Sequence, residues 1–262
     1  MGKVFLVGAG PGDPELLTCK ALRLIRSANV VLHDSLVSEG ILRLIPATAE
    51  RIDVGKRRGY RLLTQQDINS FLVSSASAHQ IVIRLKGGDP LLFGRAAEEI
   101  QALRDASVEF EIVPGISAAF GAAAASRVPL TDRALASSLL FTTYSRSPEA
   151  GRLLRNTLTS DTTVVVYMPG LQYGDLSRWL LEASLPYDTP CLVISKATQP
   201  DQISELSTVG NLATLSPLPA PAILIIGPTV ATDVDVPIVA DWLGRQSPTN
   251  FPAQATLISY KQ

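Results

Sequence analysis

The sequence IVIRLKGGDPLLFGRAAEE, residues 81–99, decides the fold. It opens with a β-branched run, 81–83, that is typical of a buried parallel strand. The Gly-Gly-Asp-Pro sequence at 87–90 then ends the strand, because glycine lets the main chain approach a ligand and proline cannot continue a sheet ladder. Apolar residues return at helical spacing over 91–104. The stretch therefore predicts a strand, a ligand-facing loop and a helix, and open α/β sheets bind ligands at such a strand end.

The composition is that of a compact globular protein. The 262 residues include 46% hydrophobic and 18% charged side chains, which is far from the disordered regime. A net charge of -1 argues against a general binder of nucleic acid, because such proteins carry a basic face. No apolar run reaches the length of a membrane span or of a signal-peptide core. We expect a cytoplasmic protein with no nucleic-acid or membrane partner.

Soft metal ligands are scarce in the sequence. The cysteines are Cys19 and Cys191, and the histidines are His33 and His79. Their spacing does not give the close cluster that a zinc or iron–sulfur site requires. We therefore expect no metal site.

A second glycine-rich turn, GAGPGDP at 8–14, follows a predicted first strand. Asp13 and Pro14 are good first residues for a helix. In a dinucleotide fingerprint the third glycine would fall on Asp13, and Pro11 lacks the amide that a phosphate would bind. By itself the turn is equally compatible with a ligand site and with a tight connection that binds nothing.

Two polar features follow the second predicted strand. Asp34 lies at the end of that strand, where a carboxylate suits a ribose hydroxyl or a proton-accepting role, although an isolated aspartate more often caps a turn. The segment RIDVGKRRGYR, 51–61, has five basic residues against the single acid Asp53. It is either a solvated surface or a site for an anionic small molecule, because arginine binds carboxylates through paired hydrogen bonds.

The order of the predicted elements indicates two α/β domains with a parallel sheet in the first half. The predicted strands are 4–7, 30–32, 51–54, 81–83, 110–113, 139–143, 163–167, 191–195, 205–208 and 222–226. The predicted helices are 14–27, 39–45, 64–78, 91–104, a helix that opens within 114–119 and runs through 125, 176–183 and 209–215. We divide the chain into an amino-terminal α/β domain, 1–130, a carboxyl-terminal α/β domain, 131–245, and a tail, 246–262, with no clear packing partner.

Eight segments, taken together and in order, resemble one family. They are VGAGPGDPELLT (7–18), DSLVS (34–38), VGKR (54–57), RLKGGDP with FGR (84–95), VPGISAA (113–119), PLT-R (129–133), YMPG (167–170) and ATQPDQ (197–202). The sequence resembles the tetrapyrrole methylases, and among them the uroporphyrinogen-III C-methyltransferases, which also form the carboxyl-terminal half of siroheme synthases. The similarity covers residues 4 to about 230.

The resemblance implies a fold and an activity. It implies two α/β domains of the tetrapyrrole methylase type, with the active site in the interdomain cleft, and a homodimer. It implies that S-adenosyl-L-methionine methylates uroporphyrinogen III at C-2 and C-7 to give precorrin-2, on the way to siroheme, cobalamin or heme d1. The product of the methyl donor is S-adenosyl-L-homocysteine, and no metal takes part.

The resemblance also implies roles for single residues. The cofactor contacts implied by motif are Pro11, Gly87, Gly88, Asp89, Leu92, Ser117, Ala118, Met168 and Ala197. The catalytic candidates are Asp34 as proton acceptor, Lys56 as proton donor, and Arg95 and Glu98 beside the substrate. Glu98 is equally compatible with a solvated helix face. The eight carboxylates of the implied substrate give the basic segment a purpose, so the expected substrate-binding residues are Arg57, Arg58 and Arg61.

The chain departs from the family pattern at three places. Asp132 stands where the family commonly has histidine, and alanines occupy 96–97 where it has glycines. Residues 143–145 read Thr-Tyr-Ser where many members have Thr-Gly-His. If Asp132 faces the pocket, it adds negative charge near a polyanionic substrate.

Other functions remain open on the sequence. One is a methylase of a later precorrin, or of a protein side chain as in diphthine synthesis. Another is a nicotinamide oxidoreductase built on Gly8, Gly10 and Asp34, against which Pro11 argues. A third is a non-catalytic protein that retains the cofactor pocket. Because the chain begins with its methylase strand, we expect neither the oxidase nor the chelatase activity of siroheme synthases.

Overall fold

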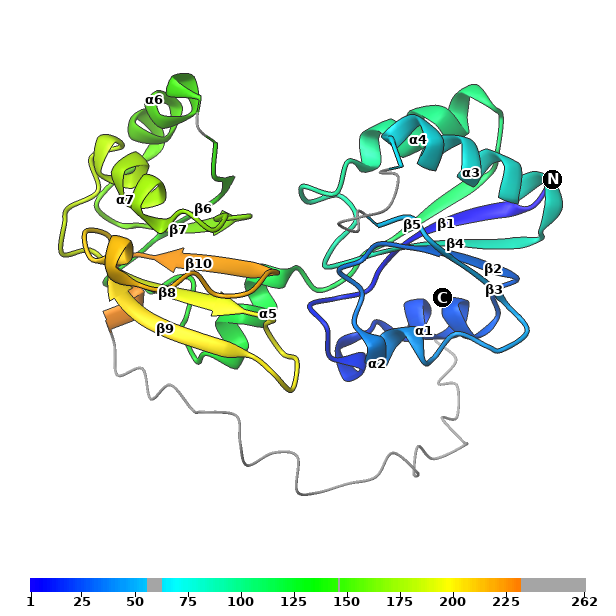
Figure 1. Ribbon diagram of the computed structural model, residues 1–262, viewed down its shortest axis with the longest axis horizontal. Coiled ribbons are helices and arrows are strands. Elements are labelled where there is room, and N and C mark those ends of the chain that lie inside the picture. The colour runs from blue at the N-terminus through cyan, green and yellow to red at the C-terminus, as the bar shows by residue number, and fades with distance from the viewer. Residues whose placement is uncertain (56–62, 146, 232–262) are drawn as a thin grey trace, which may run out of the picture.

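The computed structural model describes residues 1–55, 63–145 and 147–231, which form two α/β domains with a five-stranded sheet in each (Figure 1). The first sheet consists of β1 (Lys3–Gly8), β2 (Val30–His33), β3 (Glu50–Asp53), β4 (Ile81–Lys86) and β5 (Phe110–Val113). Its order is β3-β2-β4-β1-β5, and all of its strand pairs are parallel. The predicted fold class and the parallel first sheet are confirmed.

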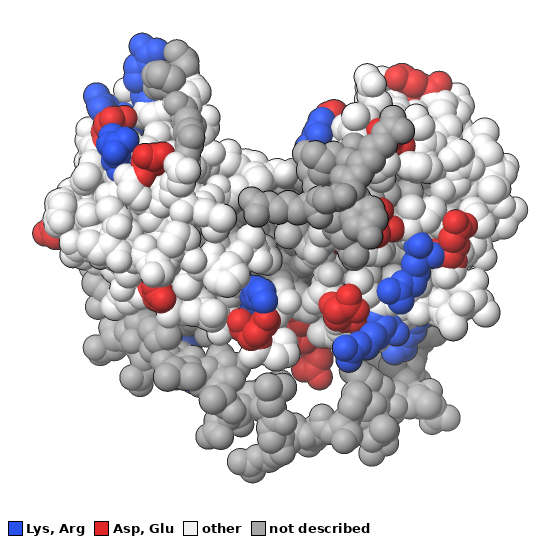
Figure 2. Space-filling model, viewed as in Figure 1, with Lys and Arg blue, Asp and Glu red and all other residues white. Residues whose placement is uncertain are grey.

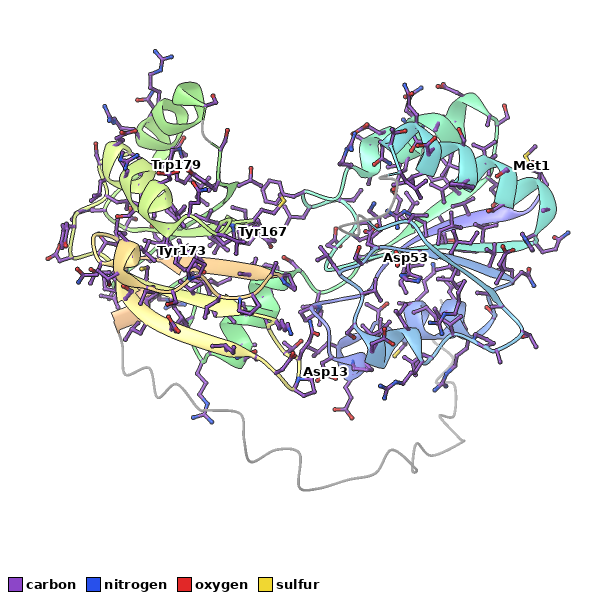
Figure 3. The ribbon with its side chains drawn as sticks, in the orientation of Figure 1. Met1, Asp13, Asp53, Tyr167, Tyr173 and Trp179 are labelled. Atoms are coloured by element: carbon purple, nitrogen blue, oxygen red, sulfur yellow. The ribbon has the colours of Figure 1, made fainter. Side chains whose placement is uncertain are left out.

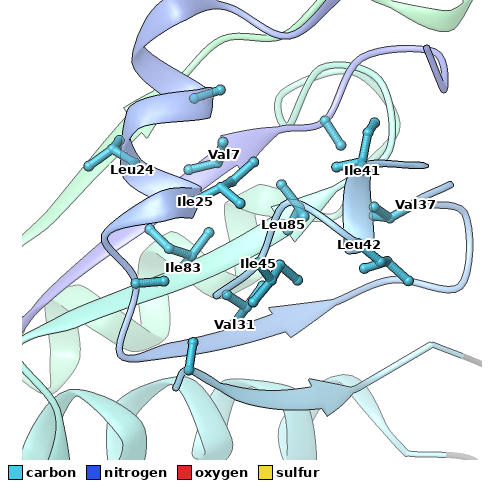
Figure 4. Close-up of a cluster of buried hydrophobic side chains, with 14 of the residues drawn as sticks. Val7, Leu24, Ile25, Val31, Val37, Ile41, Leu42, Ile45, Ile83 and Leu85 are labelled. Carbon is cyan, nitrogen blue, oxygen red and sulfur yellow. The ribbon is translucent and has the colours of Figure 1, made fainter. Parts of the chain in front are cut away.

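Helices cover both faces of the first sheet (Figure 1). On one face lie α1 (Cys19–Arg26) and α2 (Glu39–Leu42), and on the other lie α3 (Gln65–Ala78) and α4 (Ala96–Asp105). Alternate residues of β4 serve the two faces: Ile83 and Leu85 join the cluster under α1 and α2 (Figure 4), whereas Val82 joins the cluster under α3 and α4. Each fully buried aliphatic side chain contributes about 1.5–3 kcal/mol to this packing.

The second sheet is mixed. It consists of β6 (Ser138–Thr143), β7 (Thr162–Tyr167), β8 (Pro190–Ser195), β9 (Ile203–Thr208) and β10 (Ala222–Ile226), in the order β6-β7-β10-β8-β9. Only β6 and β7 pair in parallel among these strands, and the remaining pairs are antiparallel. The face under α6 (Pro148–Thr157) and α7 (Tyr173–Glu182) is packed with aliphatic and aromatic side chains, including Leu176 and Trp179.

Helix α5 (Ala118–Ala125) precedes the predicted domain boundary at 130 but packs on the second sheet. Its small residues Ala119 and Ala122 are fully buried against Val165 and Leu192. Small side chains let a helix approach a sheet closely, which is the reason for the alanine-rich sequence. The boundary itself stays a prediction, and the tail 246–262 lies outside the described residues.

Several predicted helices were wrong in extent. The helix predicted at 14–27 is a 3-10 turn, η1 (Pro14–Leu16), followed by α1, because the Thr18 hydroxyl accepts from Ala21 N and caps a new helix. The helix predicted at 91–104 begins only at Ala96, because Phe93 and Arg95 have φ values of 54° and 56°. Left-handed residues cannot continue a helix.

The carboxyl-terminal half shows similar differences. The helix predicted at 209–215 is only a 3-10 turn, η2 (Leu212–Thr214), and α2 ends at Leu42 rather than at 45. Helix α6 was not predicted, and α7 begins three residues earlier than expected. A further 3-10 turn, η3 (Pro228–Ala231), closes the described chain. None of the helices in the described ranges combines the length and apolarity that a membrane span needs.

Candidate functional site

Three loops meet at the carboxyl ends of β1, β4 and β5. Gly88 N donates to Gly10 O at 2.8 Å, and Gly10 N donates to Gly88 O at 3.2 Å. A Cβ on Gly8 would lie 2.5 Å from Gly115 N, and a Cβ on Gly115 would lie 2.4 Å from Gly88 O. Real Cβ atoms do not approach so closely, so main chain packs directly on main chain here. We call these three loops, 8–10, 87–89 and 114–115, the glycine junction.

The Asp89 carboxylate fastens the glycine junction. Its Oδ2 accepts from Gly115 N at 3.1 Å, and its Oδ1 accepts from Leu91 N at 2.8 Å. Leu92 N donates to the Asp89 carbonyl at 3.3 Å and closes the turn. The predicted cofactor residues of the β4–α4 loop, 87–92, are therefore held as one rigid unit.

The second domain reaches this unit through Tyr167, at the end of β7. The phenol hydrogen-bonds Ser117 Oγ and accepts from Ala119 N at 3.3 Å, so it holds the turn that opens α5. Burial raises the pKa of Tyr167 despite its bond to Ser117, so the phenol stays protonated at neutral pH. The rings of Phe93 and Tyr167 lie 5.0 Å apart and join the two domains.

A second contact between the domains lies at Thr198. Asp13 N donates to Thr198 Oγ1 at 3.2 Å, and a Cβ on Gly121 would lie 2.6 Å from the Pro11 ring. Figure 3 labels Asp13 where the two domains approach each other and Tyr167 at the edge of the second domain. The nine predicted cofactor residues thus lie in segments that contact one another where the domains meet, or directly beside residues that make those contacts. Their binding roles stay predictions.

Asp34 is joined to a buried group of charged residues. Arg84 Nη2 donates to Asp34 Oδ1 at 2.5 Å, and Arg84 Nε donates to Glu99 Oε1 at 2.9 Å. Lys86 Nζ lies 3.0 and 2.9 Å from the two oxygens of Glu99. The side chains of Arg84 and Lys86 are each 3% exposed, Glu99 is 0% exposed and Asp34 is 27% exposed. We call these four residues the charged cluster.

Burial and charge act in opposite directions within the charged cluster. Burial disfavours the charge on Arg84, but Asp34 and Glu99 more than offset it and raise its pKa. Burial and the charge of Arg84 lower the pKa of Lys86. The nearby Glu99 carboxylate raises it, but by less than this lowering. Two cations and two carboxylates balance, which is the condition for keeping such groups out of water.

Arg95 and Glu98 form a pair at the start of α4. Arg95 Nε and Nη2 donate to the two Glu98 oxygens at 2.7 Å each, while both side chains are about half exposed. The hydrogen bonds from Arg95 lower the pKa of Glu98. The pair therefore presents an ordered guanidinium to solvent beside the loop that carries Phe93.

The remaining predicted site residues divide into two groups. Lys56, Arg57, Arg58 and Arg61 lie outside the described residues. Asp132 turns its carboxylate onto its own loop, where Oδ1 accepts from Ala134 N at 2.8 Å and from Leu135 N at 3.0 Å. Within the described ranges, no three side chains of histidine, cysteine, aspartate or glutamate are arranged to hold a metal ion.

Large apolar side chains are exposed on loops at the strand ends of both domains. Leu36, Leu91, Phe93 and Met168 are between 43% and 63% exposed. In Figure 2 the molecule is hollowed between the part that contains α6 and the part that contains α4. Apolar walls with a few fixed polar groups are typical of small-molecule sites.

Sequence reasoning missed Arg84, Lys86, Glu99 and Tyr167. A signal for the cations was present, because Arg84 and Lys86 are two apart in a strand whose other residues are apolar. The period of two puts both on one face, and two buried cations require a carboxylate from the covering helix. The predicted candidate, Glu98, is half exposed, whereas its neighbour Glu99 is fully buried against the sheet.

Comparison with known proteins identifies related families and structures. The family model described as Tetrapyrrole (Corrin/Porphyrin) Methylases matches residues 3–213. A uroporphyrinogen-III C-methyltransferase of Paracoccus denitrificans is 42% identical over 240 residues, which cover 90% of this chain and 84% of the relative. A siroheme synthase of Actinobacillus pleuropneumoniae is 41% identical over 98% of this chain and 52% of the relative. The chain spans about half the length of the siroheme synthases that it matches.

Solved structures of methyltransferases have the same fold as this chain. A uroporphyrin-III C-methyltransferase of Thermus thermophilus complexed with S-adenosylhomocysteine is 36% identical, with a TM-score of 0.74 over 87% of this chain and 99% of that one. A cobalt precorrin-4 methyltransferase is 28% identical, with a TM-score of 0.72 over 87% of this chain and 95% of that one.

Proposed function

The chain belongs to the tetrapyrrole (corrin/porphyrin) methylases, and from that premise we propose that it is an S-adenosylmethionine-dependent C-methyltransferase that converts uroporphyrinogen III to precorrin-2. The supporting observation is the meeting of the glycine junction, the Ser117 turn and Asp34 at adjacent strand ends. The named activity of the Paracoccus relative supports the choice of substrate.

The glycine junction and the Ser117 turn suit the methyl donor. Gly88 has φ 69°, a backbone conformation that residues with side chains rarely adopt, and a Cβ there would be in van der Waals contact with Ala118 N, so main chain from two loops meets at this point. Backbone groups, Leu92 and Met168 would hold the adenosyl and methionyl parts, as would Pro11 and Ala197. When bound, S-adenosylmethionine supplies an electrophilic methyl group.

The side chains around Asp34 would serve the acceptor. Methylation of a ring carbon builds positive charge on the macrocycle, and the Asp34 carboxylate would stabilise that charge and take up the proton that the macrocycle then loses. Arg95, ordered by Glu98, and the basic segment with Arg57, Arg58 and Arg61 would bind substrate carboxylates, and Lys56 would donate a proton. The exposed apolar side chains would cover the macrocycle and keep water out.

We also propose a cytoplasmic homodimer, as in the family resemblance. Light scattering of the purified chain tests the assembly: a mass of twice the monomer supports the homodimer, and a monomer at all concentrations contradicts it.

Transfer of labelled methyl groups tests the activity. The chain is incubated anaerobically with uroporphyrinogen III and methyl-labelled S-adenosylmethionine, and the macrocycle is analysed by mass spectrometry. We expect two methyl groups at C-2 and C-7 and release of S-adenosylhomocysteine. Asp34→Asn should transfer the label about 100-fold or more slowly, the usual contribution of a proton-transfer group. A macrocycle without label would contradict the proposal.

A further inference from the structure

We propose that Arg84 is the positioning residue of Asp34: its guanidinium holds the Asp34 carboxylate at the end of β2, and Glu99 with Lys86 holds the guanidinium. The catalytic meaning of this arrangement rests on the proposed function, because it takes Asp34 as the group beside the reacting carbon. The arrangement itself rests on the geometry of the charged cluster.

The guanidinium of Arg84 is held at three points. Its Nε reaches Glu99 at 2.9 Å, its Nη2 reaches Asp34 at 2.5 Å, and its Nη1 donates to the Leu85 carbonyl at 3.3 Å. A planar guanidinium bound at three points has one orientation. Among the described residues, Arg84 is the only side chain that donates to the Asp34 carboxylate.

The charges of the cluster balance. Glu99 alone cannot neutralise both Arg84 and Lys86, and all three side chains are at most 3% exposed. The Asp34 carboxylate supplies the second negative charge, but it is 27% exposed. It is thus the one member of the charged cluster with an open side, so the cluster supports a carboxylate that faces outward.

The charged cluster is also connected to the other candidate groups through Glu99. Glu99 lies in the first turn of α4, directly after Glu98 and four residues after Arg95. Gln65 Nε2 on α3 also donates to Glu99, at 3.4 Å. The same carboxylate that fixes Arg84 therefore fixes the start of α4, so the separation between Asp34 and the Arg95–Glu98 pair is set by buried contacts.

The kinetic test is a double-mutant cycle of Arg84→Lys with Asp34→Asn. A lysine keeps the positive charge near Glu99 but cannot bridge two carboxylates as a fork does. We expect Arg84→Lys to lower kcat by roughly 100-fold, the effect of misplacing a catalytic group by about 1 Å, while the affinity for S-adenosylhomocysteine is unchanged. In the Asp34→Asn background the same change should lower kcat no further, because the group being positioned is already lost.

The matched control is Leu72→Ala, a fully buried residue of α3 on the same face of the sheet. It should lower the unfolding temperature at least as much as Arg84→Lys and leave kcat near the wild-type value. If Arg84→Lys also leaves kcat unchanged, or lowers it equally in both Asp34 backgrounds, the positioning role is overturned.

Crystal structures of the wild type and Arg84→Lys separate this inference from the proposed function. We expect the Asp34 carboxylate to leave its position at the end of β2 in the variant. An unmoved carboxylate would overturn the positioning role even if the wild type methylates uroporphyrinogen III. A displaced carboxylate would support that role even if the wild type transfers no label, in which case only the proposed function fails.

Discussion

The central strands of the two sheets, β4 and β10, are both almost fully buried but differ in chemistry. The sequence of β4, IVIRLK, contains two cations, whereas that of β10, AILII, is entirely apolar. Within the described ranges, the buried Arg, Lys, Asp and Glu side chains are those of Arg84, Lys86 and Glu99, and all three belong to the first domain. Buried charge costs stability unless it is paired. The buried charges gather at the carboxyl end of β4 and on the helix that covers it, which suggests that they serve a function there. The apolar strand β10 serves only to pack the second domain.

The two domains therefore contribute different residues to the candidate site. The first domain supplies the glycine junction, Asp34 and the fixed charges, all on a parallel sheet with helices on both faces. The second supplies Tyr167, Met168 and the aromatic contact with Phe93. Four changes, from the largest expected effect to the smallest, examine this division.

Glu99→Gln should have the largest effect. It removes the carboxylate shared by Arg84 and Lys86, and breaking a buried ion pair typically costs roughly 3–5 kcal/mol. Urea unfolding followed by circular dichroism measures the loss. The control is Glu98→Gln, whose side chain is half exposed and pairs with the equally exposed Arg95, so the unfolding free energy should change little. If Glu99→Gln lowers the unfolding free energy as little as Glu98→Gln, the charged cluster contributes little to stability.

Gly115→Ala should disturb the glycine junction. Its Cβ would lie 2.4 Å from Gly88 O, and overpacking of this kind costs about 1–3 kcal/mol. Calorimetric titration should also show weaker binding of S-adenosylhomocysteine. The control in the second domain is Gly174→Ala in α7, where the nearest atom is 3.9 Å away and the helix should gain stability. Normal binding by Gly115→Ala would remove the junction from the cofactor site.

Tyr167→Phe tests what the second domain contributes through its phenol. The change removes hydrogen bonds to Ser117 and Ala119, so the unfolding free energy should fall by about 1 kcal/mol. The affinity for S-adenosylhomocysteine should fall as well, because the Ser117 turn loses its support. Tyr187→Phe, an exposed tyrosine that bonds Asn211, is the comparison and should bind normally. If both variants bind S-adenosylhomocysteine with unchanged affinity, Tyr167 contributes to packing but not to cofactor binding.

Lys86→Met should have the smallest effect, visible as a pH dependence. Burial and Arg84 hold the pKa of Lys86 below its ordinary value of 10.5, so the unfolded chain binds more protons between that lowered pKa and 10.5. The stability of the wild type relative to Lys86→Met should therefore rise with pH across this window. Urea unfolding at neutral pH and near pH 10.5 measures it. If the stability of the wild type relative to Lys86→Met falls with pH instead, the pKa of Lys86 is not lowered by burial.

Much of the first domain could be predicted from the sequence because most of its strands contain β-branched residues and are followed within two residues by Gly or Asp. The start of α4 could not, because the loop at 91–95 has apolar residues at helical spacing while Phe93 and Arg95 adopt left-handed backbone. Glu99 was missed for a different reason: it is a charged residue on the buried face of α4, beside Ala96 and Leu103, where an apolar residue would be expected. Charged partners from distant segments, such as Asp34 and Arg84, are fixed by strand order, which local patterns do not contain.

The central claim is that the carboxyl ends of the strands of the first sheet hold both the methyl donor and the Asp34 carboxylate. A crystal structure of the chain with S-adenosylhomocysteine tests it most directly. We predict that the ligand contacts the main chain at 87–89 and 117–118, with its sulfur on the side of Asp34 and Arg84. Binding at any other surface, or with Asp34 turned away from the sulfur, would contradict the account.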